Sequence, residues 1–324
     1  HHILPLLGSL VAPLYMGGTL HIAEAMNAES IIKTLNAGKV SIIIGVPRLY
    51  DMLVKGVMNK INASFVTRLL YKITKLIGSD AVSKVIFSSV HKKFGGHLKY
   101  LVSGGAALSI ETATILKTLG LYVLEGYGMT ETAPMISFTR PGRRKVGYAG
   151  ELLPNIEVKI AENGEILVKG DNVMIGYYNN PEANAEVFTN DGWFRTGDVG
   201  YLDSDGYIYI TGRIKFVIVL ENGKNVFPAE IEEYLDAIDT ISECCVIGRK
   251  SADSDEIVLT AVVYPDFTKF PKDVDEDTVK DSIRKSINLT NKKLPTYKQI
   301  KAVELRKTEF EKTTTKKIKR QLVK

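Results

Sequence analysis

The stretch Gly126–Thr132, with the sequence GYGMTET, directly follows the apolar run LYVL at 121–124. Such a run is typical of a buried strand, and α/β sheets tend to place their ligands at strand ends. The small glycines would let the backbone approach a ligand closely. Thr130 can bond a phosphate oxygen, and the carboxylate of Glu131 can hold a hard cation such as Mg²⁺. The stretch therefore predicts a phosphate and Mg²⁺ site, with an ordinary glycine turn as the alternative.

Composition indicates an ordinary globular protein with room for two domains. The chain has 324 residues, of which 45% are hydrophobic and 24% are charged. Its net charge of +5 is compatible with anionic small molecules or an anionic membrane surface, and it is too small to indicate nucleic acid. No apolar run approaches the roughly 20 residues that a membrane span needs. The adjacent residues Cys244 and Cys245 cannot build a disulfide framework, and they are expected to lie buried in a strand of a protein from a reducing compartment.

Strand and helix patterns alternate before residue 140. The run VSIIIGV at 40–46 predicts a strand, Pro47 begins a helical pattern, and YLV at 100–102 predicts another strand. This alternation predicts a mainly parallel sheet covered on both faces. The segment SGGAA at 103–107 then joins a strand to a helix, where backbone N–H groups and the helix dipole suit a nucleotide. It is neither the dinucleotide fingerprint nor a Walker motif, so on its own it is weak evidence.

Residues 54–99 combine apolar side chains at helical spacing with interleaved lysines. One interpretation is an amphipathic pair of surface helices whose lysines are simply solvated. The other is a basic, partly apolar face that touches anionic lipid while it collects a substrate dissolved in the membrane. The sequence leaves both interpretations open, and the first is the more common case.

The chain becomes rich in β-hairpin signals after Pro134. Alternating runs flank Asn163-Gly164, Asp205-Gly206 and Asn222-Gly223, which are favoured hairpin turns. From about residue 214 the pattern is that of a small α+β domain, with strands near 243–248 and 256–264 and a helix near 275–288.

Two charged residues in this part are candidates for binding a nucleoside. Asp198 follows a glycine, and a carboxylate there can accept both hydrogen bonds of a ribose diol. Arg213 offers a planar fork of donors for a ribose or a phosphate. For each residue taken alone, turn chemistry or an ordinary surface position is the commoner explanation.

Seven motifs follow one another along the chain: SGGA at 103–106, GYGMTE at 126–131, GYYNNP at 176–181, DGWFRTGD at 191–198, GRIK at 212–215, NGKNVFPAEIE at 222–232 and KTTTKKI at 312–318. This ordered set resembles the AMP-dependent synthetase superfamily, which comprises acyl-CoA ligases, adenylation domains and luciferases. It is most similar to the bacterial long-chain fatty acid–CoA ligases, and the resemblance covers nearly the whole chain.

The resemblance implies an acyl-CoA synthetase-like fold. Residues 1–213 would be the C-terminal part of a large α/β AMP-binding domain, with mixed sheets, helices and a β-rich subdomain at about 140–213. Residues 214–324 would be a small, mobile α+β domain that turns about a hinge at Lys215.

The resemblance also implies a role for each motif. The SGGA and Gly126–Gly128 segments would frame adenine and ribose, Thr130 would bind phosphate and act in catalysis with Glu131, and Glu131 would ligate Mg²⁺. Asp198 would hold the ribose hydroxyls, Arg213 the ribose or α-phosphate, and Lys317 the acyl carboxylate and α-phosphate during catalysis. The residues expected to bind the cofactor are Gly104, Gly105, Ala106, Glu125, Gly126, Tyr127, Gly128, Thr130, Asp198, Arg213 and Lys317.

Two departures from the family pattern matter. The family's phosphate loop, which ends in Pro-Lys-Gly, would lie before residue 1, so we expect this chain to be a C-terminal fragment with little or no ligase activity alone. Where the family has Thr-Gly-Lys, this chain has TKK at 315–317, so Lys316 competes with Lys317 as the catalytic amine. Spacing to Ile318 favours Lys317.

The expected function is that of an ATP-dependent ligase for medium- or long-chain fatty acids, which uses ATP, Mg²⁺ and CoA. The expected location is the cytoplasm, with peripheral membrane contact, and no pattern indicates an oligomeric state. One alternative is an adenylating enzyme that loads an acyl carrier protein. Another, from a different class, is a catalytically silent nucleotide-binding relative.

Overall fold

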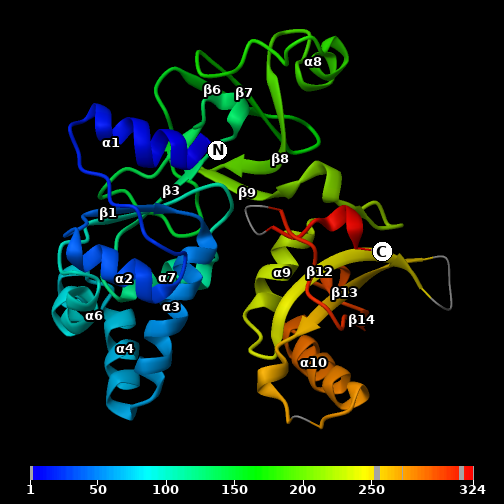
Figure 1. Cartoon of the computed structure of the whole chain (residues 1–324). Coiled ribbons are helices and arrows are strands. Elements are labelled where there is room, and N and C mark those ends of the chain that lie inside the picture. The colour runs from blue at the N-terminus through cyan, green and yellow to red at the C-terminus, as the bar shows by residue number, and fades with distance from the viewer. Residues whose placement is uncertain (1–2, 252–255, 272, 314–316, 324) are drawn as a thin grey trace. The chain divides into compact units, whose positions relative to one another are not determined.

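The computed structural model describes residues 3–251, 256–271, 273–313 and 317–323. The chain separates into two compact units (Figure 1). The first unit comprises the residues up to 196 together with 200–210, and the second comprises 197–199 together with the residues from 211 onward. The strand β8 (Phe194–Leu202) contributes to both units.

The first unit contains a five-stranded sheet in the order β1-β2-β3-β4-β5. The strands β1 (Ile42–Gly45), β2 (Tyr100–Ser103) and β3 (Val123–Tyr127) are parallel, as the alternating pattern predicts. The short strands β4 (Ser137–Phe138) and β5 (Glu151–Leu152) extend the sheet in antiparallel fashion. The carboxyl ends of β2 and β3 therefore lie side by side, and the two glycine-rich motifs follow these ends.

The helices of this unit begin and end where the sequence provides caps. The side chain of Asn27 accepts a hydrogen bond from Ser30 N at the start of α2, Pro47 occupies the first turn of α3, and Gly78 ends α4 in a left-handed conformation. In Figure 1 α2, α3 and α7 lie near β1, and α4 lies alongside α3. The helices are a π-helix (Pro5–Val11), α1 (Ala12–Tyr15), α2 (Ala28–Ala37), α3 (Pro47–Asn62), α4 (Phe65–Ile77), α5 (Asp80–Ile86), α6 (Ser88–Lys93), α7 (Ile110–Thr118) and α8 (Pro181–Val187).

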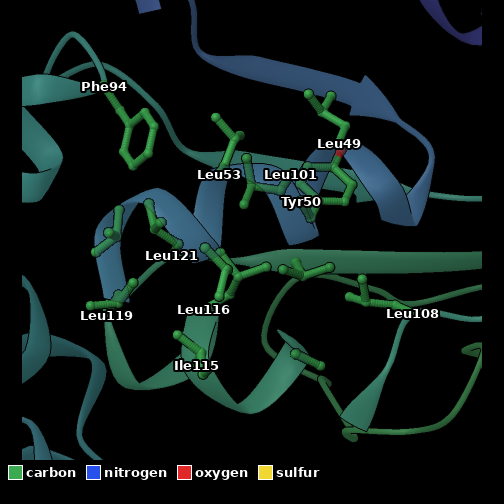
Figure 2. Close-up of a cluster of buried hydrophobic side chains, with 14 of the residues drawn as sticks. Leu49, Tyr50, Leu53, Phe94, Leu101, Leu108, Ile115, Leu116, Leu119 and Leu121 are labelled. Atoms are coloured by element: carbon green, nitrogen blue, oxygen red, sulfur yellow. The ribbon is translucent and has the colours of Figure 1, made fainter. Parts of the chain in front are cut away.

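The core of this unit lies between the parallel strands and the helices α3 and α7, where Leu53, Leu101 and Leu116 pack together (Figure 2). Tyr50 is fully buried, and its hydroxyl donates to the carbonyl of Val102 at 2.6 Å, which ties α3 to β2. A cavity of about 10 Å³ within this cluster is only about large enough for one water molecule. It is a small packing gap and does not identify an acyl-chain tunnel.

A four-stranded sheet follows in the order β6-β7-β8-β9. The strands β6 (Ile156–Ile160) and β7 (Glu165–Gly170) form the antiparallel hairpin that the turn Asn163-Gly164 predicts. The strand β9 (Ile208–Arg213) neighbours β8, and the turn at Asp205-Gly206 separates them.

The second unit has a three-stranded sheet of β12 (Ile241–Lys250), β13 (Ile257–Pro265) and β14 (Ala302–Leu305). The helices α9 (Pro228–Asp236) and α10 (Glu276–Asn291) pack on one face through a cluster that includes Cys244 and Val246. Because side chains alternate along a strand, Cys245 faces the other way. It packs there with Phe310 and Ile318 of the C-terminal segment. Both cysteines are free and buried, as expected.

The second unit also contains the hairpin of β10 (Ile218–Val219) and β11 (Asn225–Val226), which the turn Asn222-Gly223 predicts. Among the described residues, the single-turn 3₁₀ helices are Thr130–Thr132, Ile214–Phe216, Phe267–Lys269, Thr296–Lys298 and Arg320–Leu322.

Candidate active site

The glycine-rich segment after β2 is exposed only in part. Gly104 is buried and its N–H donates to Gly45 O at 3.2 Å, whereas Gly105 and Ala106 are exposed. Gly105 has a φ of +79°, which favours glycine. Ser103 is only 2% exposed, and its hydroxyl finds no hydrogen-bond partner within the described part of the chain. A buried hydroxyl without a partner is unusual and marks this strand end as a place where a polar ligand could bond.

Close packing within the chain requires two glycines at the end of β3: Gly126, in the strand, and Gly128, just after it. A Cβ at Gly128 would lie 2.0 Å from Pro134 O, and one at Gly126 would lie 2.8 Å from the Met135 methyl group. The neighbouring carbonyls of Glu125 and Tyr127 accept hydrogen bonds from Thr139 N and Ile136 N, both at 2.8 Å. This close approach of the chain to itself accounts for the glycines, so approach to a ligand remains a prediction.

The Thr130–Thr132 turn presents one carboxylate and one exposed hydroxyl. Thr130 is exposed, and the Oε1 atom of Glu131 accepts a hydrogen bond from the Tyr177 hydroxyl at 2.9 Å. Burial, together with the hydrogen bond to Glu131 and its charge, raises the pKa of Tyr177. Tyr177 therefore stays protonated and orients the carboxylate. The sequence contains this tyrosine in the GYYNNP motif but gives no signal that it reaches Glu131.

Hydrogen bonds from the segment after β7 also fix the backbone of this turn. Asn172 donates its side-chain amide to Thr132 O at 2.8 Å and to Met135 O at 2.7 Å, while Met174 N donates to Glu131 O at 2.8 Å. Three contacts from the segment after β7 thus fix the backbone around Glu131. We regard Asn172 as a positioning residue that sequence patterns did not reveal.

The donors at this turn fit a Mg²⁺ ion that arrives with a nucleotide. Among the described residues no group of three or more His, Cys, Asp or Glu side chains could cage a metal ion. Mg²⁺ usually keeps several waters and binds through one or two carboxylates plus substrate phosphates. The single carboxylate of Glu131, beside the hydroxyl of Thr130, matches that mode and not a permanent protein cage.

The second group of expected residues comes together within the second unit. The Oδ1 atom of Asp198, on β8, pairs with Nε of Arg213, at the end of β9, at 2.7 Å. The Asp198 side chain is 7% exposed, whereas that of Arg213 is 46% exposed. The pair thus places a buried carboxylate next to a partly accessible guanidinium. The sequence suggests both residues but not their direct contact.

Lys317 belongs to the same group. Lys312 and Ile318 form an antiparallel bridge, and within this turn Lys317 O accepts from Thr313 N at 2.8 Å. Ile318 packs toward the β12–β14 sheet, and Lys317, its neighbour, retains exposed surface. Desolvation and the positive charge of Arg213 lower the pKa of Lys317, while the carboxylate of Asp198 opposes this. The three charges therefore act on one another. Lys316, the competing amine, lies outside the described residues.

The expected hinge residue lies in the 3₁₀ turn Ile214–Phe216. The Lys215 amine lies 5.0 Å from the centre of the Phe216 ring, and the guanidinium of Arg320 lies 5.4 Å from the same ring. Both distances suit a cation–π contact. A hinge role for Lys215 remains a prediction.

Comparison with known proteins gives two family matches. Residues 1–178 match the family of AMP-binding enzymes, and residues 215–324 match the AMP-binding enzyme C-terminal domain. The chain is 30% identical over 320 residues to the 2-succinylbenzoate–CoA ligase of Listeria innocua, which covers 98% of this chain and 58% of that protein. It is 40% identical over 165 residues to the long-chain-fatty-acid–CoA ligase FadD15 of Mycobacterium bovis, covering 51% and 27%.

Solved structures agree on the fold. ATP-bound MatB from Rhodopseudomonas palustris superposes with a TM-score of 0.72 at 28% identity, covering 98% of this chain and 57% of that one. The anthranilate CoA ligase AuaEII with anthranoyl-AMP gives 0.73 at 22% identity, covering 99% and 57%, which supports the fold alone. The chain thus spans somewhat more than half the length of the relatives that it matches throughout.

Proposed function

The chain belongs to the family of AMP-binding, adenylate-forming enzymes, and we propose that it serves the ATP-dependent joining of a medium- or long-chain fatty acid to CoA. The observation that carries this proposal is the grouping of Asp198, Arg213 and Lys317, whose charges interact within one unit. A carboxylate, a guanidinium and an amine of lowered pKa suit a site that must hold a ribose, a phosphate and a second anion.

In the first half-reaction the fatty carboxylate attacks the α-phosphorus of ATP, which forms acyl-AMP and releases pyrophosphate. Two anions must meet, so cationic groups have to offset their repulsion and the charge that develops. We assign that task to the ammonium of Lys317, and we assign the ribose hydroxyls to Asp198 and the α-phosphate to Arg213. Bound Mg²⁺ would supply further charge neutralisation at the phosphates, with Glu131 as the residue that holds the ion and Thr130 as the residue that bonds a phosphate oxygen.

In the second half-reaction the thiol of CoA attacks the acyl carbon, the thioester forms, and AMP leaves with the electron pair of the anhydride bond. A mixed anhydride hydrolyses readily, so the site has to exclude water between the two steps. The steps need different groups at one carbon. We propose that the small domain supplies them in turn by rotating about Lys215.

The nature of the acid rests on the comparisons. Identity of 40% to a long-chain fatty acid ligase favours a fatty acid, while identity of 30% over nearly the whole chain to a succinylbenzoate ligase makes an aromatic acid the competing substrate. Carrier-protein loading and a silent nucleotide-binding role remain alternatives. The silent role is disfavoured because such a protein need not keep Thr130, Glu131, Asp198, Arg213 and Lys317 together.

ATP–pyrophosphate exchange on the natural-length protein tests this proposal. The panel contains fatty acids from about eight to eighteen carbons, a range suited to an apolar pocket, together with succinylbenzoate. Exchange that depends on a fatty acid, followed by thioester on adding CoA, is the expected result. Exchange without thioester would favour a carrier-protein acceptor, which acyl carrier protein in place of CoA would reveal. A complete lack of exchange with every acid in the panel would contradict the proposal.

Lys317→Ala separates binding from chemistry. The variant should lose acyl-AMP formation and keep ATP binding, because Lys317 is assigned to charge that develops during the reaction. Exchange that survives in this variant would show the role to be misassigned.

We propose a cytoplasmic location from the free cysteines and from the use of ATP and CoA. Within the described ranges, no helix is both long and apolar enough to cross a bilayer.

A further inference from the structure

The helix α4 turns its polar side toward the protein. Thr74 is fully buried, and the Thr67 hydroxyl donates to Ile61 O at 2.6 Å. Between them in the helix, Tyr71 packs edge-on against Phe87, with the ring centres 6.4 Å apart. These three positions, spaced by four and three residues, form one helical face. The inward face of α4 is therefore narrow, and two of its three members carry hydroxyl groups on short side chains.

The apolar side of α4 is exposed instead. Phe65 is 71% exposed, Ile73 is 42% exposed and Leu76 is 87% exposed, and Val66, Leu69 and Ile77 are exposed as well. The preceding helix α3 has the usual arrangement, with its apolar side chains Leu53, Val57 and Ile61 buried. The expectation of a surface helix is confirmed, but its apolar residues do not pack inward as they do in an ordinary amphipathic surface helix.

Cations line one side of this apolar face. Arg68, Lys72 and Lys75 are all exposed and lie at spacings of four and three residues, so they form a third stripe along the helix. The helix contains no Asp or Glu. Within the described ranges, none of the three cations has a carboxylate within salt-bridge distance.

From this geometry we infer that α4 docks on the surface of an anionic lipid bilayer, with its apolar face among the acyl chains and its three cations at the headgroups. A helix with a large apolar face, a row of cations along one side of it and no acidic residue suits this environment. A second copy of the chain suits it less well, because two such faces would bring six cations together without a compensating carboxylate. The inference does not depend on the proposed function, and its test needs no turnover.

The test is flotation of the 324-residue chain with vesicles of phosphatidylcholine alone or with about 30% phosphatidylglycerol, a fraction chosen to give a strongly negative surface. The chain should bind the anionic vesicles, and binding should weaken as salt is raised. Each basic residue near such a surface contributes about five-fold to partitioning. Arg68→Gln/Lys72→Gln/Lys75→Gln should therefore weaken binding on the order of 100-fold.

A matched control changes an equal set of exposed cations on and just after α10. Arg284→Gln/Lys285→Gln/Lys292→Gln alters the net charge by the same amount and should change binding by less than about three-fold, since these residues lie outside the docking face. Equal losses in the two triple variants would mean that only net charge matters, which would overturn the inference.

The apolar face has its own pair of variants. Ile73→Glu/Leu76→Glu should abolish flotation, whereas Ile175→Glu/Leu289→Glu, at exposed positions outside α4, should not. Because Ile73 and Leu76 are exposed, melting of the first variant should be unchanged. If Ile73→Glu/Leu76→Glu unfolds at a lower temperature than the wild type, its loss of flotation is not used. The triple glutamine variant and the salt series then test the docking of α4 on lipid.

Two results would contradict the inference. One is wild-type chain that fails to float with anionic vesicles. The other is a wild-type dimer in sedimentation velocity that becomes a monomer in Ile73→Glu/Leu76→Glu while vesicle binding is absent, which would make α4 a contact between copies.

Discussion

At the residue scale, close packing requires a glycine at Gly128, near the candidate site, and does not require one at Gly56, inside α3. Gly128→Ala should destabilise the protein by about 2 kcal/mol or more, because its Cβ would lie 2.0 Å from a backbone oxygen that has little room to move. Gly56→Ala is the control, since Gly56 lies inside α3 and a Cβ there would meet no neighbouring atom within 4 Å beyond its own helical backbone. There alanine should stabilise by about 0.5–1 kcal/mol. Thermal and urea unfolding measure both changes, and similar effects would contradict this account.

The hydroxyl of Tyr177 is expected to orient the carboxylate of Glu131. Tyr177→Phe removes the 2.9 Å hydrogen bond and keeps the ring, so it should weaken binding of ATP with Mg²⁺ about five-fold. Binding of ATP without the metal ion should change little. Calorimetry with and without Mg²⁺ distinguishes the two cases. Equal losses would assign Tyr177 to the nucleotide and not to the carboxylate.

Lys317 provides a titration that needs no catalysis. Its amine should lose its proton at a lower pH than an ordinary lysine side chain, because desolvation and Arg213 both disfavour the ammonium. Arg213→Gln should raise the pKa of Lys317, and Asp198→Asn should lower it, since Asp198 favours the charged form. NMR of ¹³C-labelled lysine side chains would follow these shifts. Shifts of the opposite sign would show that the three charges do not form one group.

At the element scale, the C-terminal segment that carries Lys317 is held by a largely buried ion pair. Glu232 on α9 pairs with the Arg320 guanidinium, accepts a hydrogen bond from Val246 N at 2.6 Å, and is 13% exposed. Arg320 also donates to Val246 O at 3.2 Å. The pair thus connects α9, β12 and the segment after Lys317, which makes Glu232 and Arg320 positioning residues for that lysine.

Arg320→Ala should destabilise the second unit by about 3 kcal/mol, because Glu232 would remain buried without its partner. Burial raises the pKa of Glu232 above its usual value, and Arg320 and the hydrogen bond from Val246 N offset only part of that rise. Loss of Arg320 should raise that pKa further, so the penalty is largest above the folded-state pKa. It should shrink as the pH falls and the carboxyl group becomes protonated.

The control for this variant is Glu232→Gln/Arg320→Met, which removes both charges. It should be less destabilising than Arg320→Ala at neutral pH, and its stability should depend less on pH over the same range. Unfolding as a function of pH compares the two. A penalty for Arg320→Ala that does not change with pH would contradict the role assigned to Glu232.

Elements with a regular pattern were predictable from the sequence, and those that depend on distant contacts were not. Hairpins at Asn163-Gly164 and Asn222-Gly223 formed as predicted because the turn chemistry is local. The sequence did not predict that the apolar face of α4 points away from the protein, because an amphipathic surface helix with its apolar face inward is the commoner case. Helical spacing shows that a face exists, but only the packing of Thr67, Tyr71 and Thr74 decides which face points inward.

At the scale of the whole molecule, the family and the fold were predictable because seven motifs stand in one order along the chain. The identities of the candidate residues came from those motifs as well. The motifs did not predict which of these residues contact one another. The pair Asp198–Arg213 joins neighbouring strands, and Tyr177 reaches Glu131 across 46 positions, so neither contact leaves a periodic trace in the sequence.

The central claim is that this chain carries an acyl-adenylate site, and one binding measurement tests it most directly. Calorimetry would compare a fatty acyl sulfamoyl adenosine, a stable mimic of acyl-AMP, with the same nucleoside lacking its acyl chain. We predict tighter binding of the acylated form. We also predict at least about ten-fold weaker binding by Asp198→Asn, through lost hydrogen bonds to the ribose. Absence of binding, or binding that neither the acyl chain nor Asp198 affects, would contradict the account.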